Sequence, residues 1–418
     1  MRFCILFWPL VRLSLIGKCK TRDPTSKTAT PSKLTCSFHP IALVFIPTFT
    51  YEVITMRPLF PFQRVGLTAV IILVGLFALS TGGTSRSVAA GAPADRETLD
   101  IYFIDVEGGA ATLIVTPRGE SMLVDSGFPG DRDAGRIAAV AREQAKLSQI
   151  DHYITTHWHT DHFGGIAQLA RILPVKRYYG HGIPNPLPRD INPELVQAYR
   201  STAAGDGQVL KPADEIKLLQ GGKSVPPLRV RILAANGVVT GEKTDAPQTR
   251  TCTSNHQAAQ KDESDNANSV AFVLEFGSFR FFDGGDLTWN VEHKLVCPTN
   301  LPGKVDVFQV NHHGLDTSNN PVLIEALAPR VAIINNGAKK GGQARTYASL
   351  KSARGIESIF QLHRNVQTGE QDNAPSTMVA NDNESCQGNF IKLSVDSRGK
   401  SYTVTIPAKG TMKTYTTR

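Results

Sequence analysis

From residue 99 onward, short apolar segments with the period of a strand alternate with segments whose apolar residues recur at helical spacing. This order is typical of a layered α/β domain, and we expect it to occupy nearly all of 95–418. With 41% hydrophobic and 20% charged residues, the chain is excluded from the wholly disordered, collagen-like and coiled-coil classes.

The expected strands are 99–106, 111–116, 121–125, 151–156, 175–179, 228–233, 269–276, 279–283, 305–310 and 331–335. The expected helices are 132–146, 165–173, 289–296 and 321–327. Two segments interrupt the alternation: 184–222 is Pro-rich and irregular, and 240–268 is polar without an apolar period, so both are expected to be surface insertions. The tail, 390–406, alternates like edge strands.

Residues 1–94 differ from the rest of the chain in composition. A short basic start at 57–64 precedes an apolar run at 65–80, and small residues follow as far as Ala94. This is the layout of a secretory signal peptide over 56–94, with an uncleaved membrane anchor as the alternative. We expect Met56 to be the true start, 1–55 to be a misannotated upstream segment, and 95–418 to be a periplasmic or secreted domain.

The basic charge of the chain lies in the same leader. Residues 1–94 hold 10 of the 45 Lys and Arg residues but only 2 of the 37 acidic ones, which leaves 95–418 neutral. Because nucleic-acid binding needs clustered basic side chains, nucleic acid is less favoured as a partner than a small-molecule substrate. No stable membrane insertion is expected after signal cleavage. Cys252, Cys297 and Cys386 follow the leader, so at most one disulfide can form among them.

The strongest chemical signal is the run from Thr156 to Gly165. His157, His159, Asp161 and His162 fall within six positions at the end of an expected strand. Imidazole nitrogens and carboxylate oxygens at this density suit zinc or a similar divalent ion. His157 and His159 alternate at the strand end and can face one ion, while Asp161 and His162 can reach a second ion beside it. A polar surface loop explains a single histidine better than it explains four possible ligands.

This motif and four shorter strings resemble the metallo-β-lactamase-fold hydrolases, and they follow one another in the order that is typical of that family. The shorter strings are Ile104-Asp105-Val106 before a Gly-Gly turn, Asp125-Ser-Gly127, Gly285-Asp286-Leu287 and Asn311-His312-His313-Gly314. The last two forms look most like the metallo-hydrolase domain of ComEC-type competence proteins and its stand-alone exported relatives. The resemblance implies an αββα sandwich with two divalent metal ions, zinc or alternatively manganese, in a groove between the sheets.

Carried over by position, the resemblance places His157 and His159 on one metal and Asp286 between the two ions. Asp161, His162 and one histidine of the 312–313 pair would hold the other metal. His313 is favoured as this ligand and His312 as a contact to the substrate or leaving group, and the opposite assignment stays open. The candidate catalytic residues are therefore Asp161, His312 and Asp286. Asp125 is expected to orient the loop and a ligand histidine.

The chain also departs from the family pattern. Many members supply a third histidine to the first metal about twenty residues before the bridging aspartate, and 262–269 contains none. Asn266 and Asn268 are candidates to line the site, an acid of this stretch is a candidate ligand, and a one-metal enzyme stays open. His181 can approach the groove or be an ordinary strand-end residue. Lys339 and Lys340 can hold an anionic substrate, although such a turn is usually only solvated.

These features predict an exported hydrolase that uses metal-activated water. A phosphodiester or phosphorylated small molecule is the favoured substrate, and lactones and other carboxylic esters are the alternative. A non-enzymatic metal-binding module of the cell envelope is the alternative from another class. β-Lactam hydrolysis is disfavoured, because the second half of the motif set departs from true lactamases.

Overall fold

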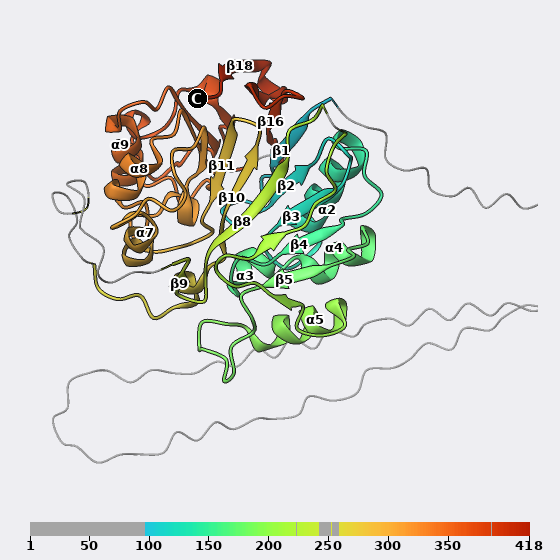
Figure 1. Ribbon diagram of the computed structural model, residues 1–418. Coiled ribbons are helices and arrows are strands. Elements are labelled where there is room, and N and C mark those ends of the chain that lie inside the picture. The colour runs from blue at the N-terminus through green and yellow to red at the C-terminus, as the bar shows by residue number, and fades with distance from the viewer. Residues whose placement is uncertain (1–96, 223, 242–251, 253–258, 386) are drawn as a thin grey trace, which may run out of the picture. The chain divides into compact units, whose positions relative to one another are not determined.

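Two sheets lie against each other in the middle of the domain, as the computed structural model shows (Figure 1). The structure describes residues 97–418 except 223, 242–251, 253–258 and 386. The predicted upstream segment, the predicted signal peptide, Cys386 and much of the polar segment 240–268 lie outside the described residues.

The first sheet has nine strands in the order β18-β17-β16-β1-β2-β3-β4-β5-β6. It is antiparallel from β18 to β3 and parallel from β3 to β6. Its strands are β1 (Leu99–Phe103), β2 (Thr112–Val115), β3 (Ser121–Val124), β4 (His152–Ile154), β5 (Tyr178–Gly180), β6 (Gln208–Val209), β16 (Ile391–Val395), β17 (Ser401–Ile406) and β18 (Thr411–Thr416).

The second sheet runs β15-β14-β13-β12-β11-β10-β8-β7, and β9 pairs with β8. Strands β11 to β15 are parallel, and β10 and β8 are antiparallel to their neighbours. Its strands are β7 (Glu215–Ile216), β8 (Leu228–Ala235), β9 (Val238–Val239), β10 (Ala271–Phe276), β11 (Phe279–Asp283), β12 (Val307–Gln309), β13 (Val331–Ile334), β14 (Ser358–His363) and β15 (Val379–Asn381).

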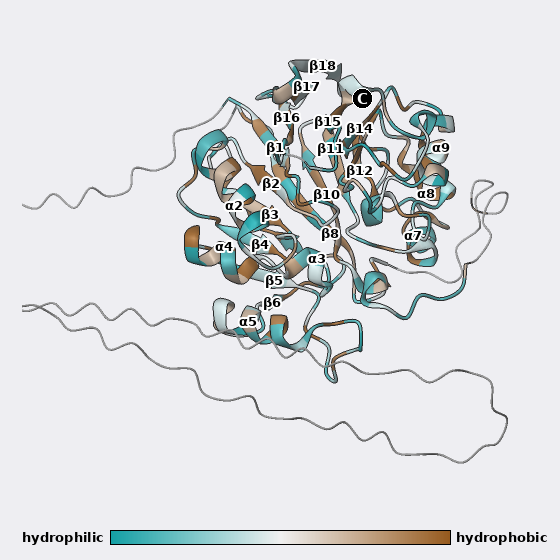
Figure 2. Cartoon of the chain, turned by 180° about the vertical axis from the view of Figure 1, so that it is seen from behind, coloured by the Kyte–Doolittle hydropathy of each residue, from teal (hydrophilic) through white to brown (hydrophobic). Residues whose placement is uncertain are grey.

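Helices cover the outer face of each sheet, which gives four layers and three hydrophobic clusters (Figures 1 and 2). Between the sheets, the rings of Phe103 and Phe281 meet edge to face at 6.0 Å. Helices α2, α4 and α5 pack on the first sheet, and α7, α8 and α9 pack on the second. The helices are α2 (Asp131–Ala139), α3 (Thr160–Phe163), α4 (Ile166–Ile172), α5 (Pro193–Ala203), α7 (Trp289–Val296), α8 (Pro321–Leu327) and α9 (Ala344–Ser352).

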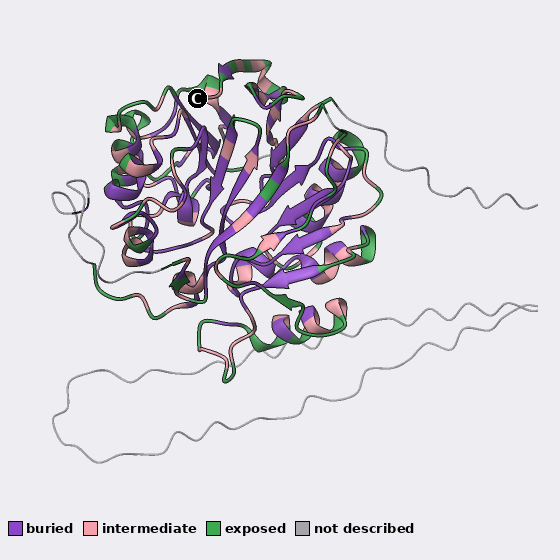
Figure 3. Cartoon of the chain, viewed as in Figure 1, coloured by how far each residue is buried: buried purple, intermediate pink, exposed green. Residues whose placement is uncertain are grey.

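The predicted fold class, an α/β domain with two sheets between helices, is confirmed. Every residue of β1, β2 and β3 is buried, as a sheet covered on both faces requires (Figure 3). Helices α7 and α8 have the predicted bounds. The helix predicted over 132–146 is α2 followed by a π-helical turn at Val140–Gln144. None of the helices among the described residues is long and apolar enough to span a membrane.

Two predictions about irregular and edge segments are wrong. The segment 184–222 contains α5, because Asn192 caps the backbone N–H groups of Glu194 and Leu195 and a proline occupies the first helical position. It also contributes β6 and β7 to the sheets. In the tail, β16 is an interior strand between β1 and β17, and the edge strand is β18, which lies beyond the predicted segment.

A disulfide joins Cys252 to Cys297, with the Cα atoms 5.6 Å apart. Cys297 directly follows α7, so the bond ties the polar insertion to this helix. It is one of the three possible pairings of Cys252, Cys297 and Cys386, of which only one can form at a time.

Candidate metal centre

The histidine motif begins where β4 ends and continues into α3. Asp125, directly after β3, fixes this turn: its Oδ1 accepts a hydrogen bond from the Thr156 N–H at 2.8 Å, and its Oδ2 accepts one from Thr156 Oγ1 at 2.7 Å. Asp125 Oδ2 also lies 2.7 Å from His162 Nδ1. Because this ring nitrogen faces a carboxylate, His162 presents Nε2 to the space between the sheets.

Four side chains converge in that space. Asp161, His162, Asp286 and His313 each offer one ligand atom, and all four atoms lie within 4.8 Å of one another. His162 Nε2 is 3.1 Å from Asp286 Oδ2 and 3.1 Å from His313 Nε2, which is 3.2 Å from Asp161 Oδ2. Two imidazole nitrogens and two carboxylate oxygens form a donor set that suits zinc or manganese. We call these four residues the four-ligand cluster.

Asp286 has the central position in the centre. It follows β11, and its Oδ2 lies 3.1 Å from His162 Nε2, 3.4 Å from His313 Nε2 and 3.4 Å from His312 Nε2. His157 Nε2 is 3.8 Å from the same oxygen. A carboxylate between histidines of both sheets suits the bridging role expected of Asp286, which stays a prediction.

His157 and His159 adjoin the four-ligand cluster without joining it. His157 Nε2 lies 3.1 Å from His159 Nδ1, so the two rings can share one ion. His159 Nε2 lies 2.9 Å from Asp190 Oδ2, a carboxylate that orients the ring. Within the described part of the chain, the four-ligand cluster is the one group of three or more possible ligands that is so compact. The structure thus assembles one of the two predicted ion sites more closely than the other.

The segment 262–269, which lacks the third histidine, forms hydrogen bonds that hold the backbone of the histidine motif. Asp265 Oδ2 accepts a hydrogen bond from the Trp158 N–H at 2.7 Å and lies 3.2 Å from His181 Nε2. Its other oxygen accepts a bond from Asn268 at 3.0 Å. Asp265 and His181 therefore hold the turn between His157 and His159. Asn266 instead faces the centre, with its Nδ2 3.5 Å from His312 Nε2.

The two histidines after β12 differ in their surroundings. His313 is fully buried, and its Nε2 belongs to the four-ligand cluster. His312 turns its Nδ1 to Ser318 Oγ at 3.1 Å and Thr317 Oγ1 at 3.2 Å, which leaves Nε2 toward Asp286. Burial lowers the pKa of His312 to about 4, so this ring is neutral at pH 7. This geometry favours the first of the two assignments that the sequence left open.

Glu292 on α7 holds the histidine turn, a role that the sequence motifs did not indicate. Its Oε1 accepts hydrogen bonds from Asn311 Nδ2 at 2.6 Å and the Asn319 N–H at 2.7 Å, and its Oε2 accepts one from the Asn320 N–H at 2.7 Å. His312 lies within the segment that these bonds fix. A glutamate on the apolar face of a predicted helix is the signal that could have revealed it.

The charges within the centre support one another. Burial raises the pKa of Asp161, but His162, His313 and Lys340 outweigh it and hold this pKa well below its usual range. Burial also lowers the pKa of His162, yet Asp286, Asp161 and Asp125 keep it well above the usual value. The charge of Asp161 and that of His162 therefore stabilise each other.

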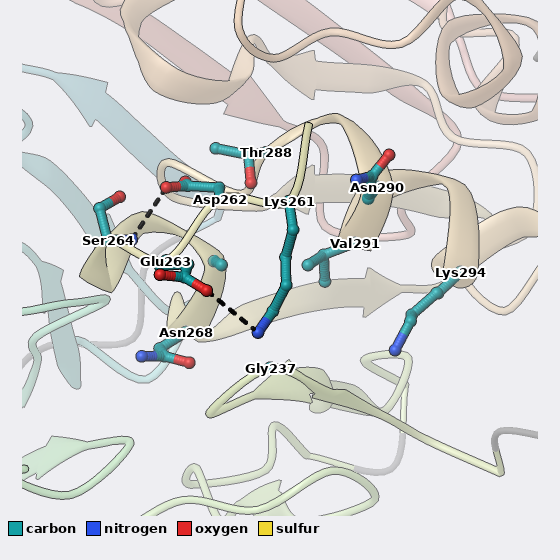
Figure 4. Close-up of a pocket in the computed structure, with 11 residues that line it drawn as sticks. Gly237, Lys261, Asp262, Glu263, Ser264, Asn268, Thr288, Asn290, Val291 and Lys294 are labelled. Carbon is teal, nitrogen blue, oxygen red and sulfur yellow. Dashed lines mark hydrogen bonds and ion pairs between the residues drawn. The ribbon is translucent and has the colours of Figure 1, made fainter. Parts of the chain in front are cut away.

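Two pockets that share lining residues lie beside α7, and one of them reaches the centre at His312. One, of about 360 Å³, has Asn266, Trp289, Thr317 and His312 in its lining. The other, of about 490 Å³, shares Lys261, Asp262, Thr288 and Asn290 with the first (Figure 4). We call the pocket of about 360 Å³ the inner pocket. His312 is part of its lining, so a small molecule bound in it can contact the centre at this residue.

Residues 104–229, which contain the histidine motif, match the family model of the metallo-beta-lactamase superfamily. These residues belong to a domain of the metallo-β-lactamase superfamily. Outside the matched residues, Asp286 and His313 follow strands of the second sheet and face the motif.

Two curated relatives are similar to parts of this chain. Recombination protein 2 of Haemophilus influenzae is 25% identical over 244 residues, which are 58% of this chain and 25% of the relative. A UPF0173 metal-dependent hydrolase of Cupriavidus taiwanensis is 30% identical over 119 residues, which are 28% of this chain and 39% of the relative. The chain thus spans less than half of the length of either relative.

Among solved structures, the chain is similar to Tm1679, a metal-dependent hydrolase of the β-lactamase superfamily, with a TM-score of 0.37 and 12% identity over 64% of this chain and 96% of the other. It is also similar to CmlA, a diiron β-hydroxylase from Streptomyces venezuelae, with a TM-score of 0.33 and 17% identity over 57% of this chain and 45% of the other.

Proposed function

We propose that the superfamily domain is an exported, metal-dependent hydrolase that cleaves a phosphodiester or a similar small ester. The observation that carries this proposal is the four-ligand cluster, with its ligand atoms within 4.8 Å and His312 beside it at the inner pocket. The similarity to a metal-dependent hydrolase and to a recombination protein supports the reaction class and favours a phosphodiester.

Asp286 and His312 would have different roles in hydrolysis. A divalent ion held by the four-ligand cluster would supply Lewis acidity and a water of lowered pKa. Asp286 orients the nucleophilic water by accepting its hydrogen bond, since its carboxylate lies between the histidines of both sheets. The Ser318 and Thr317 hydroxyls hold His312 through Nδ1, so its Nε2 faces the centre and is the atom that can contact the leaving-group oxygen.

The metal content proposed is two ions, zinc or alternatively manganese. The four-ligand cluster would hold the tighter ion, because its donors already lie close together. His157 and His159, with Asp286 3.8 Å from His157, would hold the weaker one.

Export is proposed on the signal-peptide layout of 56–94 and on the disulfide between Cys252 and Cys297. Disulfides persist in oxidising compartments such as the bacterial periplasm and the extracellular space. The matching location is periplasmic or secreted.

The test is turnover of bis-p-nitrophenyl phosphate and p-nitrophenyl acetate by purified protein loaded with zinc or manganese. The Asp161→Ala variant should lose at least about 100-fold in turnover, because it removes one of the cluster ligands, while its circular dichroism and cooperative unfolding stay unchanged. A wild-type protein that binds metal but hydrolyses neither ester would support the non-enzymatic binding module instead. Undiminished turnover by Asp161→Ala would show that the proposed centre is wrong.

A further inference from the structure

The ammonium group of Lys340 enters the centre from the turn that follows β13. It forms an ion pair with Asp161 Oδ2, the carboxylate oxygen that also lies 3.2 Å from His313 Nε2 and 3.4 Å from His162 Nε2. The Lys340 side chain is 36% exposed, so it reaches the four-ligand cluster from the solvent side. Its neighbour Lys339 is 57% exposed and pairs with Glu384 at the surface. The two adjacent lysines thus have different surroundings.

The backbone of this turn is locked against the histidine turn. The Gly342 N–H donates to the His313 carbonyl at 2.8 Å, and the Gly337 N–H donates to the Lys340 carbonyl at 2.8 Å. Gly341 has a φ of 78°, and a Cβ there would lie 2.1 Å from the His313 carbonyl oxygen. Only glycine fits this contact, so the base of Lys340 has a fixed position relative to the centre.

The stem of Lys340 is also confined. A Cβ on Gly108 would approach Lys340 Cβ to 2.9 Å, so the Gly-Gly turn after β1 packs directly on this side chain. The Lys340 ammonium lies 5.9 Å from the centroid of the Phe128 ring. These contacts aim the charge at the centre, and the side chain stays partly open to solvent.

From these contacts we infer that Lys340 forms an anion subsite that binds the negatively charged oxygen of the substrate, which makes a phosphodiester the preferred substrate class. Asp161 and Asp286 together balance the charge of one divalent ion. A cation bound at Asp161 Oδ2 takes the carboxylate oxygen that Lys340 pairs with and leaves the ammonium charge uncompensated. An anionic oxygen of the substrate can restore the balance, whereas a neutral ester cannot. The inference rests on the proposed function and deepens it.

The test compares Lys340→Ala and Lys340→Arg with the matched control Lys339→Ala, all loaded with zinc. The first readout is binding of inorganic phosphate by isothermal titration calorimetry, with metal content measured by mass spectrometry on the same samples. Lys340→Ala should weaken phosphate binding at least about tenfold, because a charge-assisted contact is lost. Lys340→Arg should stay within about threefold and Lys339→Ala within about twofold of wild type. Metal content should stay the same in all of them.

The second readout is the ratio of kcat/KM for bis-p-nitrophenyl phosphate to that for p-nitrophenyl acetate. In Lys340→Ala this ratio should fall about tenfold or more, mainly through KM. An unchanged phosphate affinity and ratio in Lys340→Ala would overturn the inference. So would an equal loss for both esters together with a loss of metal, because Lys340 would then serve only to hold Asp161. If the wild type hydrolyses neither ester but binds phosphate through Lys340, the anion subsite stands and the hydrolase proposal fails.

Discussion

Asp286 Oδ2 lies within 3.4 Å of three imidazole nitrogens. A single oxygen therefore contacts both histidines after β12 and His162 of the motif. The histidine motif could be found in the sequence because its ligands are neighbours along the chain. The assignment of His312 and His313 could not, because both follow the same strand and only the local backbone decides which ring points inward. Both have left-handed backbone angles, with φ of 52° and 53°.

At the residue scale, substitutions of His312 and of His313 should have different effects on metal binding and turnover. His313→Ala should weaken metal binding at least about 100-fold, because it deletes a member of the four-ligand cluster. His312→Ala should keep the metal of the cluster and lose turnover, because its Nε2 faces Asp286 from the pocket side. Metal titration by calorimetry, together with turnover of bis-p-nitrophenyl phosphate, checks both. The reverse pattern would show that His312 is the ligand.

At the scale of elements, α7 and α8 could be predicted because their apolar residues recur at helical spacing. Helix α5 was missed because its proline-rich surroundings indicated an irregular segment, although Asn192 and the proline after it are a capping signal. The role of α7 in the site also required the structure. Two successive left-handed histidines cost roughly 1–2 kcal/mol each, and the hydrogen bonds of Glu292 from α7 hold this turn.

Glu292 should make the stability of this element pH-dependent. Burial raises its pKa from 4.5 to about 7, so the folded state retains a proton that the unfolded state has released. The resulting stabilisation is complete below pH 4.5 and is lost as the pH rises through 7. Relative to Glu292→Gln, the wild type should therefore lose on the order of 2 kcal/mol of unfolding free energy between pH 5 and pH 8.

Urea unfolding at several pH values measures this difference. Glu325→Gln, on an exposed position of α8, is the matched control, and its difference from wild type should stay within about 0.5 kcal/mol at every pH. A difference between Glu292→Gln and wild type that does not change with pH would contradict the burial argument.

At the scale of the whole molecule, the centre joins the two sheets. Asp161 and His162 follow β4 of the first sheet, and Asp286 and His313 follow β11 and β12 of the second. Behind them, a chain of hydrogen bonds crosses the sandwich, from Thr112 Oγ1 to Gln309 Oε1 at 2.7 Å and from Gln309 Nε2 to Asp283 Oδ2 at 2.9 Å. The sequence motifs predicted the layers, but not this polar connection, because Thr112 and Gln309 are 197 positions apart.

The four-ligand cluster should bind a divalent metal ion between the two sheets. Native mass spectrometry of the purified protein, after addition of zinc or manganese and removal of the excess, measures this binding. We expect about two ions per chain at saturation, one of them retained on dilution, and a higher melting temperature for the metal-bound protein. His313→Ala should lose the retained ion. If the wild-type protein held less than about 0.2 ions per chain, with an unchanged melting temperature, the cluster would not be a metal site.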